Sequence, residues 1–327
     1  MRPVALLLAG LFCFASLRRM ALAAGISLTI CAPILYAQAD FQVESNLVVL
    51  HATVADHQGR VVRDLPVTTF HVYEDGAPQN IVLFQQEDTP VTVGLVVDNS
   101  GSMRRKVPEV VAAATAFARS SNPEDQMFIV NFNERVWLGL PPGEAFVSDP
   151  DKLKAALLQI RSSGETALYD AIASALGHVR ESPLSKRVLI VLSDGGDNAS
   201  TRRFPEILSL LQQSNVIVYT VGLFDEYDKD RNPAVLKQLA KVSGGQAFFP
   251  KEVPDVTNVL QAVSRDIRNQ YTIGYVPTNG KQDGTYRDVR VDLTGAHANL
   301  WTVRTRTGYF AAPQDSAPTG SQKAKER

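Results

Sequence analysis

The sequence predicts an α/β fold: a doubly wound, mainly parallel sheet with β-sandwich segments before and after it in the chain. The first observation is an alternation of apolar strands with helical periodicity between residues 89 and 268. The second is that these strands are apolar at nearly every position, which is typical of strands covered on both faces. The third is a period-2 pattern with intervening turn residues in residues 40–88 and 269–312.

The α/β region, residues 89–268, is expected to open with the apolar strand 91–97 and to close with a helix at 256–268. Repeated strand–helix units with right-handed crossovers predict helices on both faces of the sheet. Between these two elements we expect strands at 126–132, 187–192, 216–221 and 246–249, and helices at 107–118, 152–160, 167–179, 204–213 and 233–242.

The two flanking regions, residues 40–88 and 269–312, are each short for an independent domain. A sheet of two or three strands buries too little apolar surface to be stable alone. We therefore expect the two regions to pair into one sandwich, with the α/β region inserted between its halves. The expected strands lie at residues 46–54, 70–73, 81–84, 271–275, 287–293 and 301–306.

The first 39 residues have the pattern of an export signal. They contain no acidic residue, carry two apolar stretches separated by Arg18 and Arg19, and close with Ala-Gln-Ala before Asp40. An uncleaved membrane anchor is the alternative, against which Pro33 and the short apolar length argue. We expect a signal peptide at residues 1–39 and export to the periplasm or the cell exterior.

Composition limits the chemistry of the remaining chain. Both cysteines, Cys13 and Cys31, lie in the leader, so the mature chain would have no thiol, disulfide or zinc–thiolate chemistry. The net charge is −1, and it becomes −4 without the three arginines of the leader. Neither value gives a reason to expect nucleic-acid binding. Residues 313–327, rich in Pro, Ser, Lys and Gly, are expected to form a disordered tail.

The strongest functional signal follows the opening strand of the α/β region. The sequence Asp98-Asn99-Ser100-Gly101-Ser102 places one carboxylate and two hydroxyls at the carboxyl end of that strand. Binding sites in open doubly wound sheets form in the crevice at this edge. Because Mg²⁺ and Ca²⁺ prefer oxygen ligands, the motif indicates a divalent-metal site. Taken singly, such residues could instead be helix N-caps, a turn or a solvated rim.

Two further elements extend this motif to a resemblance. Thr166 follows a glycine-containing loop at a helix start, and Asp194 follows a buried strand. Together with Asp98, Ser100 and Ser102, they resemble the metal-ion-dependent adhesion site of the von Willebrand factor type A family, in the order of that family. The similarity covers the α/β region. With its flanking β segments, the chain is similar to exported, type-A-related bacterial proteins.

The resemblance implies a ligand and a function. It implies that Asp98, Ser100, Ser102, Thr166 and Asp194 hold Mg²⁺, or Mn²⁺ or Ca²⁺, directly or through water. It also implies a protein partner whose Asp or Glu side chain completes the coordination of the ion. The residues provide no nucleophile–base pair, so we expect no enzymatic activity, and we expect membrane contact only through the leader if it is uncleaved. We therefore expect metal-dependent protein–protein binding or adhesion. The alternative is a structural envelope-assembly protein in which the metal only stabilises the loops.

Competing chemistries lack residues that they need. A phosphatase of the haloacid dehalogenase type requires a second Asp two residues after the first, where this chain has Ser100. The five histidines show no paired ligand spacing, and phosphate-loop and nucleophile-elbow motifs are absent. Asp197 is either an additional carboxylate just outside the metal ligands or a solvated turn residue. Residues 225–232 resemble the start of a calcium loop but lack its central glycine and closing glutamate.

Overall fold

The structure of the chain is a computed structural model. The described residues all belong to one compact unit, and none of the helices within them is long and apolar enough to cross a membrane. The predicted signal peptide, the predicted tail and most of the calcium-loop-like stretch at 225–232 lie outside the described residues. The structure describes residues 47–159, 162–224, 231–295 and 298–311.

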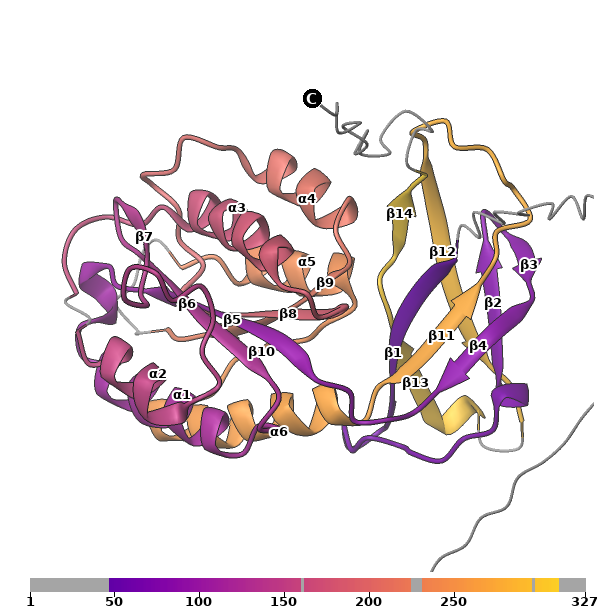
Figure 1. Cartoon of the computed structure of the whole chain (residues 1–327), viewed down its shortest axis with the longest axis horizontal. Coiled ribbons are helices and arrows are strands. Elements are labelled where there is room, and N and C mark those ends of the chain that lie inside the picture. The colour runs from indigo at the N-terminus through magenta and orange to yellow at the C-terminus, as the bar shows by residue number, and fades with distance from the viewer. Residues whose placement is uncertain (1–46, 160–161, 225–230, 296–297, 312–327) are drawn as a thin grey trace, which may run out of the picture. The chain divides into compact units, whose positions relative to one another are not determined.

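The α/β region forms a six-stranded sheet in the order β10-β9-β8-β5-β6-β7. All neighbours are parallel except β7, which runs antiparallel to β6 at the edge. Figure 1 shows helices on both faces of this sheet, so the predicted fold class is confirmed. The strands are β5 (Val91–Asp98), β6 (Gln126–Phe132), β7 (Val136–Leu138), β8 (Lys186–Ser193), β9 (Val216–Gly222) and β10 (Ala247–Phe248).

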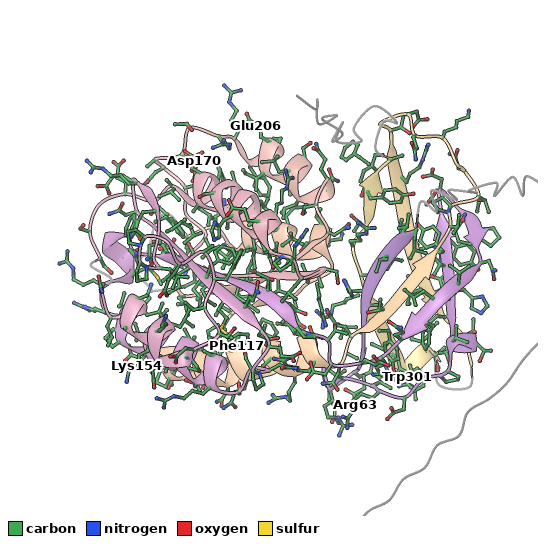
Figure 2. The ribbon with its side chains drawn as sticks, in the orientation of Figure 1. Arg63, Phe117, Lys154, Asp170, Glu206 and Trp301 are labelled. Carbon is green, nitrogen blue, oxygen red and sulfur yellow. The ribbon has the colours of Figure 1, made fainter. Side chains whose placement is uncertain are left out.

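The helices cover the sheet through their apolar stripes. On one face α1 contacts α2 and α6, and on the other α4 contacts α3 and α5. Phe117 of α1 is buried, whereas Lys154 of α2 is exposed and lies on the outer side of its helix (Figure 2). The helices are α1 (Val107–Arg119), α2 (Pro150–Leu157), α3 (Leu168–His178), α4 (Phe204–Gln212), α5 (Pro233–Ser243) and α6 (Val256–Arg268).

Strand β5 lies near the middle of the sheet, and every residue in it is buried. It pairs with β6 on one side and β8 on the other, in a register that sets Asp98 opposite Phe132 and Val97 opposite Leu192. The carboxyl ends of three parallel strands therefore meet at one edge. Whatever side chains follow these strands are brought together there.

The flanking regions form two four-stranded sheets, β13-β1-β11-β4 and β14-β12-β2-β3. Each sheet combines strands from before and after the α/β region: β1 pairs with β11 and β13, and β2 pairs with β12. The inner faces share one apolar core. The strands are β1 (Val48–Asp56), β2 (Phe70–Glu74), β3 (Ala77–Gln79), β4 (Ile81–Gln85), β11 (Tyr271–Tyr275), β12 (Tyr286–Leu293), β13 (Trp301–Arg304) and β14 (Gly308–Phe310).

The strand predicted at 301–306 is present as β13 but ends at Arg304, because the chain then changes sheets. Strand β13 pairs with β1, and after three residues β14 pairs with β12 in the opposite sheet. The strands β3 and β7 were also not predicted; both are three residues long and lie at sheet edges. Short 3₁₀ helices lie at Val67–Thr69, Gly101–Met103, Val179–Glu181, Val253–Asp255 and Ala298–Leu300.

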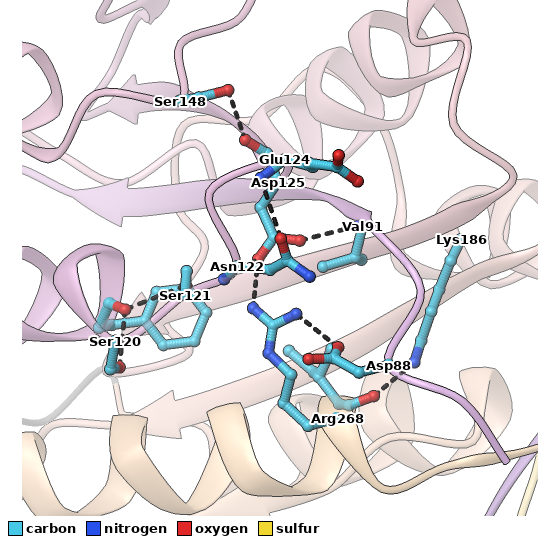
Figure 3. Close-up of polar contacts among 12 residues, drawn as sticks. Asp88, Val91, Ser120, Ser121, Asn122, Glu124, Asp125, Ser148, Lys186 and Arg268 are labelled. Carbon is cyan, nitrogen blue, oxygen red and sulfur yellow. Dashed lines mark hydrogen bonds and ion pairs between the residues drawn. The ribbon is translucent and has the colours of Figure 1, made fainter.

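A charged cluster lies at the amino-terminal end of the parallel sheet, where the chain enters and leaves the α/β region (Figure 3). Arg268, the last residue of α6, donates to Asp88 Oδ1 at 2.7 Å and also to Asp125 Oδ2. Asp125 Oδ1 accepts from the Val91 backbone N–H at 3.0 Å, and Lys186 donates to a backbone carbonyl of α6. The two connections to the sandwich are therefore held together by ion pairs and hydrogen bonds.

Candidate metal site

Three loops meet at the carboxyl edge of the parallel sheet. Asp98 ends β5, Asp194 directly follows β8, and Thr166 lies in the loop before α3. Backbone hydrogen bonds join the loop after β5 to the loop before α3. The Gly101 N–H donates to the Gly164 carbonyl at 3.2 Å, and the Ser163 N–H donates to the Asn99 carbonyl at 2.9 Å. The chain itself therefore holds these loops in contact.

Four of the five predicted residues belong to one connected set. The Ser102 hydroxyl donates to Asp194 Oδ2 at 2.7 Å, and the Ser100 and Ser102 hydroxyls hydrogen-bond to each other at 3.0 Å. The Ser100 backbone N–H donates to Asp98 Oδ1 at 2.8 Å. The structure thus links residues that are almost one hundred positions apart through two serine hydroxyls.

Thr166 is attached to the site through its backbone. Its N–H donates to Asn198 Oδ1 at 2.8 Å, and its carbonyl accepts from the N–H groups of Asn198 and Ala199, each at 3.0 Å. Within the described residues, no hydrogen bond joins the Thr166 side chain to the other four predicted residues. Thr166 is buried, and the loop that follows Asp194 fixes its position.

Ser102 and Thr166 are not the helix N-caps considered for them, whereas Asp194 does make a turn contact, since its Oδ1 accepts from the Gly196 N–H at 3.0 Å. The N-caps of α1 and α3 are Lys106 and Ala167, not Ser102 or Thr166, and neither cap makes a side-chain hydrogen bond. Asp98 is fully buried, so it is not a solvated rim residue. Burial of a carboxylate is costly unless a cation or several donors compensate it. The site therefore needs an explanation beyond capping.

The electrostatics of the site favour a cation. Burial and the nearby negative charge of Asp194 raise the pKa of Asp98 to about 6, although the Ser193 hydroxyl donates to Asp98 Oδ2 at 2.6 Å and opposes this rise. Neither aspartate forms an ion pair with a basic side chain in the described part of the chain. Two carboxylates at close range without a counterion repel each other, and a divalent cation between them would remove that cost.

The donor set fits a hard divalent ion. The candidate ligands are two carboxylates and three hydroxyls, without a thiol or an imidazole, and Mg²⁺ takes such oxygen ligands while keeping part of its water. Among the described residues, no group of three or more His, Cys, Asp or Glu side chains is placed to hold a metal ion. An ion bound here would therefore depend on the serine and threonine hydroxyls as well as on the aspartates.

The sequence did not point to several residues that shape the site. Ser193 is the last residue of β8, and the pairing of β8 with β5 brings its hydroxyl to Asp98. Asn133, just after β6, donates from Nδ2 to the Ser163 carbonyl at 3.1 Å and accepts from the Ala167 N–H through its own carbonyl. Position at a strand end was the available signal, but it does not reveal which loop a polar side chain will contact.

Asp197 supports α3 instead of the candidate metal ligands. Its Oδ1 accepts from the Tyr169 N–H at 3.2 Å and from the Ser200 hydroxyl at 2.6 Å. Asp170 reinforces this by accepting from the backbone and side chain of Thr201; Figure 2 marks its place on α3. In the described residues, Asp197 forms no hydrogen bond with the five predicted ligands. The loop after Asp194 is thereby fixed against the first turns of α3.

The glycine after Asp194 is required by a close backbone approach. Gly195 has a φ of 79°, and a Cβ there would lie 2.6 Å from the Asn232 carbonyl oxygen. In the same place the Asn232 N–H donates to the Asp194 carbonyl at 3.0 Å. A side chain at this position would push the two segments apart. The turn that presents Asp194 therefore depends on glycine.

Comparison with known proteins finds a similarity in the α/β region. Residues 93–196 match the family model of the von Willebrand factor type A domain, a span that includes all five predicted ligands. The chain therefore contains a von Willebrand factor type A domain. No curated protein matches the sequence.

Several solved structures are similar to this chain at low sequence identity. A von Willebrand factor type A protein from Catenulispora acidiphila is 14% identical, with a TM-score of 0.50 over 84% of this chain and 76% of that chain. An aerotolerance-related membrane protein from Bacteroides fragilis is 16% identical, with a TM-score of 0.45 over 54% and 98%. Proximal thread matrix protein 1 from the mussel byssus, solved with a zinc-occupied MIDAS motif, is 16% identical, with a TM-score of 0.48 over 59% and 49%.

Proposed function

We propose that this protein binds a partner protein through a divalent cation held at the carboxyl edge of its parallel sheet. Asp98, Ser100, Ser102, Thr166 and Asp194 would hold the ion, directly or through water. Mg²⁺ is the expected ion, with Mn²⁺ or Ca²⁺ as the alternatives. The ion would supply an electrophilic coordination position, and an Asp or Glu side chain of the partner would occupy it.

One observation supports this proposal above the others: two buried aspartates are linked by serine hydroxyls and, within the described residues, form no ion pair with a basic side chain. Asp98 is 0% exposed and Asp194 is 2% exposed. Two buried like charges without a counterion destabilise the fold, because they repel each other. A bound cation from solution would remove this repulsion.

The site is buried at its base and open at its rim. Ser102 and the segment 163–165 are exposed, whereas Asp98, Ser100 and Asp194 are buried. A partner side chain can therefore approach from the side of Ser102. Domains of this family generally mediate protein–protein interaction, and this open rim is consistent with such a role.

The structural alternative, in which the metal only holds the loops together, has less support. The loops are already joined by backbone hydrogen bonds from Gly101 to Gly164 and from Ser163 to Asn99. Asn133 adds a side-chain bond to the same loop. These contacts require no ion, so a bound ion is available for a partner.

Enzymatic activity is not part of the proposal. Within the described residues, no hydroxyl of the site hydrogen-bonds to a histidine, so the nucleophile–base pair of hydrolytic catalysis is not formed there. We propose that binding takes place outside the cytoplasm, on the basis of the predicted signal peptide. That segment lies outside the described residues, and the place of action is therefore tested separately, by fractionation of cells expressing the full chain.

The metal site is tested by thermal unfolding of the mature chain in Mg²⁺, Mn²⁺ or EDTA. An ion that binds only the folded state at about one hundred times its Kd contributes about 2.7 kcal/mol, so Tm should rise by several degrees. Asp194→Asn and Ser102→Ala should lose most of this rise. Glu165→Gln is the matched control, because Glu165 is an exposed carboxylate beside Thr166; its response should equal that of the wild type.

Partner binding is tested by capture from an envelope extract with the immobilised wild type, in Mg²⁺ and in EDTA. The expected result is a protein retained only in Mg²⁺ and not retained by Asp194→Asn. Equal melting of the wild type in all three solutions would refute the metal site. If Tm rises with the metal but the partner is retained equally in Mg²⁺ and in EDTA, the structural alternative would be favoured instead.

A further inference from the structure

A second candidate site lies where the end of α5 faces the sandwich. The cavity has a volume of about 550 Å³ and is lined by the α5 end with its following loop, by residues 289–291 of β12, and by residues 303–307. Ligand sites of proteins commonly measure about 300–1,000 Å³. This cavity is separate from the candidate metal site, because none of the five predicted metal ligands lines it.

The lining of this cavity is strongly basic. Among the described residues, no acidic side chain lines it, whereas five cationic side chains do: Lys237, Lys241, Arg290, Arg304 and Arg306. The whole protein has nearly balanced charge, with 33 basic and 34 acidic residues. A local excess of this kind concentrates positive potential in a concave surface and attracts anions.

Two of the five cations are neutralised by the protein. Arg304 pairs with Asp266 at 2.9 Å, and Arg290 pairs with Asp292. In the described residues, the other three have no carboxylate within ion-pair distance. Of these, the Lys237 ammonium lies 5.4 Å from the centre of the Phe249 ring. Lys241 lies in the last turn of α5, where part of its charge balances the helix dipole.

Arg306 is the least compensated of these cations. Its guanidinium donates to the neutral Asn215 side chain and lies 5.3 Å from the centre of the Tyr309 ring, and burial lowers its pKa. Among the residues that line the cavity, three side-chain atoms are shielded from solvent and have no hydrogen-bond partner in the described part of the chain: Arg306 Nε, Arg304 Nη1 and Thr305 Oγ1. Arg306 is half-buried, and donors shielded from solvent without a partner cost free energy.

The backbone is built so that these residues come close to α5. Gly244 is the C-cap residue of α5 and has a φ of 83°. A Cβ at this position would lie 2.5 Å from the backbone nitrogen of Arg306. Glycine therefore allows the segment 304–306 to approach the helix end directly. This approach brings two arginines from the sandwich to the lysines of α5, which the sequence alone does not place together.

We propose that this cavity binds a small polyanion that carries two or more phosphate groups. A phosphate group concentrates up to two negative charges on three acceptor oxygens. Guanidinium groups match these oxygens with paired N–H donors, and lysines supply additional point charges. Arg306 and Arg304 would donate from the sandwich, and Lys237 and Lys241 would donate from α5. The bound anion would also compensate the charge of the half-buried Arg306.

The test is calorimetric titration of the mature protein with tripolyphosphate, in EDTA and at physiological ionic strength. We expect saturable binding, and we expect Arg306→Gln and Lys241→Gln each to weaken it by about tenfold or more. Lys251→Gln, which removes an exposed lysine that does not line the cavity, should change the affinity by less than about twofold. Asp194→Asn should also bind normally, so the outcome is independent of the metal site.

Citrate is the matched ligand, because it carries a comparable negative charge on carboxylates. Weaker binding of citrate supports recognition of phosphate, whereas equal binding would refute it. Lys241→Gln should fold normally, because Lys241 is exposed and its loss leaves the buried contacts intact. Weaker binding by this variant therefore cannot be attributed to misfolding. No binding of tripolyphosphate, or binding that neither Arg306→Gln nor Lys241→Gln weakens, would overturn the proposal.

Discussion

The two ends of the parallel sheet both bury a carboxylate, but among the described residues only the carboxylate at the amino-terminal end is paired with a cationic side chain. At the amino-terminal end, Asp125 is 1% exposed and is bound by Arg268, which also binds Asp88 (Figure 3). At the carboxyl end, Asp98 is fully buried beside Asp194 and is contacted by serine hydroxyls and a backbone N–H. The same type of residue therefore has a complete environment at one end and an incomplete one at the other.

This difference separates a structural carboxylate from a candidate ligand. An internal ion pair satisfies both charges in the folded chain, so its role ends with holding the connections to the sandwich. A buried pair of carboxylates without a counterion raises the free energy of the folded chain, and an external cation can lower it. The cavity beside α5 shows the opposite imbalance, since its cations exceed its anions. In each case, incomplete charge compensation is the reason why we propose a ligand there.

The largest expected effect is at the amino-terminal end. Arg268→Met should reduce the free energy of unfolding by about 3–5 kcal/mol, because it leaves the buried Asp125 carboxylate without its cation. Urea unfolding at neutral pH measures this change. Arg265→Met is the control, because Arg265 lies in the same helix and is exposed. A loss for Arg268→Met no larger than that for Arg265→Met would show that the ion pair does not stabilise the junction.

At the carboxyl end of the sheet, removing a charge should increase the free energy of unfolding instead of reducing it. Asp98→Asn removes one of two like charges, so in EDTA at about pH 8 the variant should be more stable than the wild type by on the order of 2 kcal/mol. The gain from Mg²⁺ should be lost at the same time. Asp125→Asn is the matched comparison, and it should destabilise the chain because it leaves Arg268 with one carboxylate fewer. Destabilisation of both variants in EDTA would contradict the contrast between the two ends.

The smallest expected effect concerns His51, which lies near the cationic side chains of Lys186 and Arg306. Burial and the positive charges of Lys186 and Arg306 lower the pKa of His51 to about 3. The unfolded chain binds this proton below about pH 6.5 and the folded chain does not, so stability falls as the pH decreases. Between pH 7 and 5.5 the loss assigned to His51 should be about 1 kcal/mol.

Urea unfolding at the two pH values measures this loss. His51→Gln should remove about 1 kcal/mol of the pH dependence. His71→Gln, on the exposed face of β2, is the control and should retain the wild-type pH dependence. An unchanged slope for His51→Gln would show that its environment is less cationic than the packing indicates. The anion site would then lose part of its electrostatic support, because Arg306 contributes to both.

Sequence reasoning worked best where periodicity extends over many residues. The strand at 126–132, the helix at 256–268 and the strand at 271–275 have the predicted boundaries. Apolar spacing over a whole element is strong evidence, because only one period buries all its apolar side chains. The short edge strands β3, β7 and β14 escaped prediction. Each has three residues, too few to show a period, and their existence depends on pairing with a neighbouring strand.

For the candidate site too, some features were predictable from the sequence and others were not. The sequence predicted the oxygen-bearing residues at the ends of β5 and β8 and before α3, because parallel strands bring their carboxyl ends to one edge. It did not predict that the Ser102 hydroxyl contacts Asp194, or that Ser193 contacts Asp98. These contacts depend on strand register and on the path of each loop. The assignment of the five residues as metal ligands remains a prediction.

The sequence by itself determined the fold class and the residue types available at the edge of the sheet, since both follow from local patterns and strand polarity. Only the tertiary structure decided which buried charges are compensated. Arg268 reaches Asp125 across 143 positions, and Arg306 comes to the end of α5 through Gly244. Charge compensation depends on distances of a few ångströms between segments far apart in the chain, and no local pattern encodes those distances.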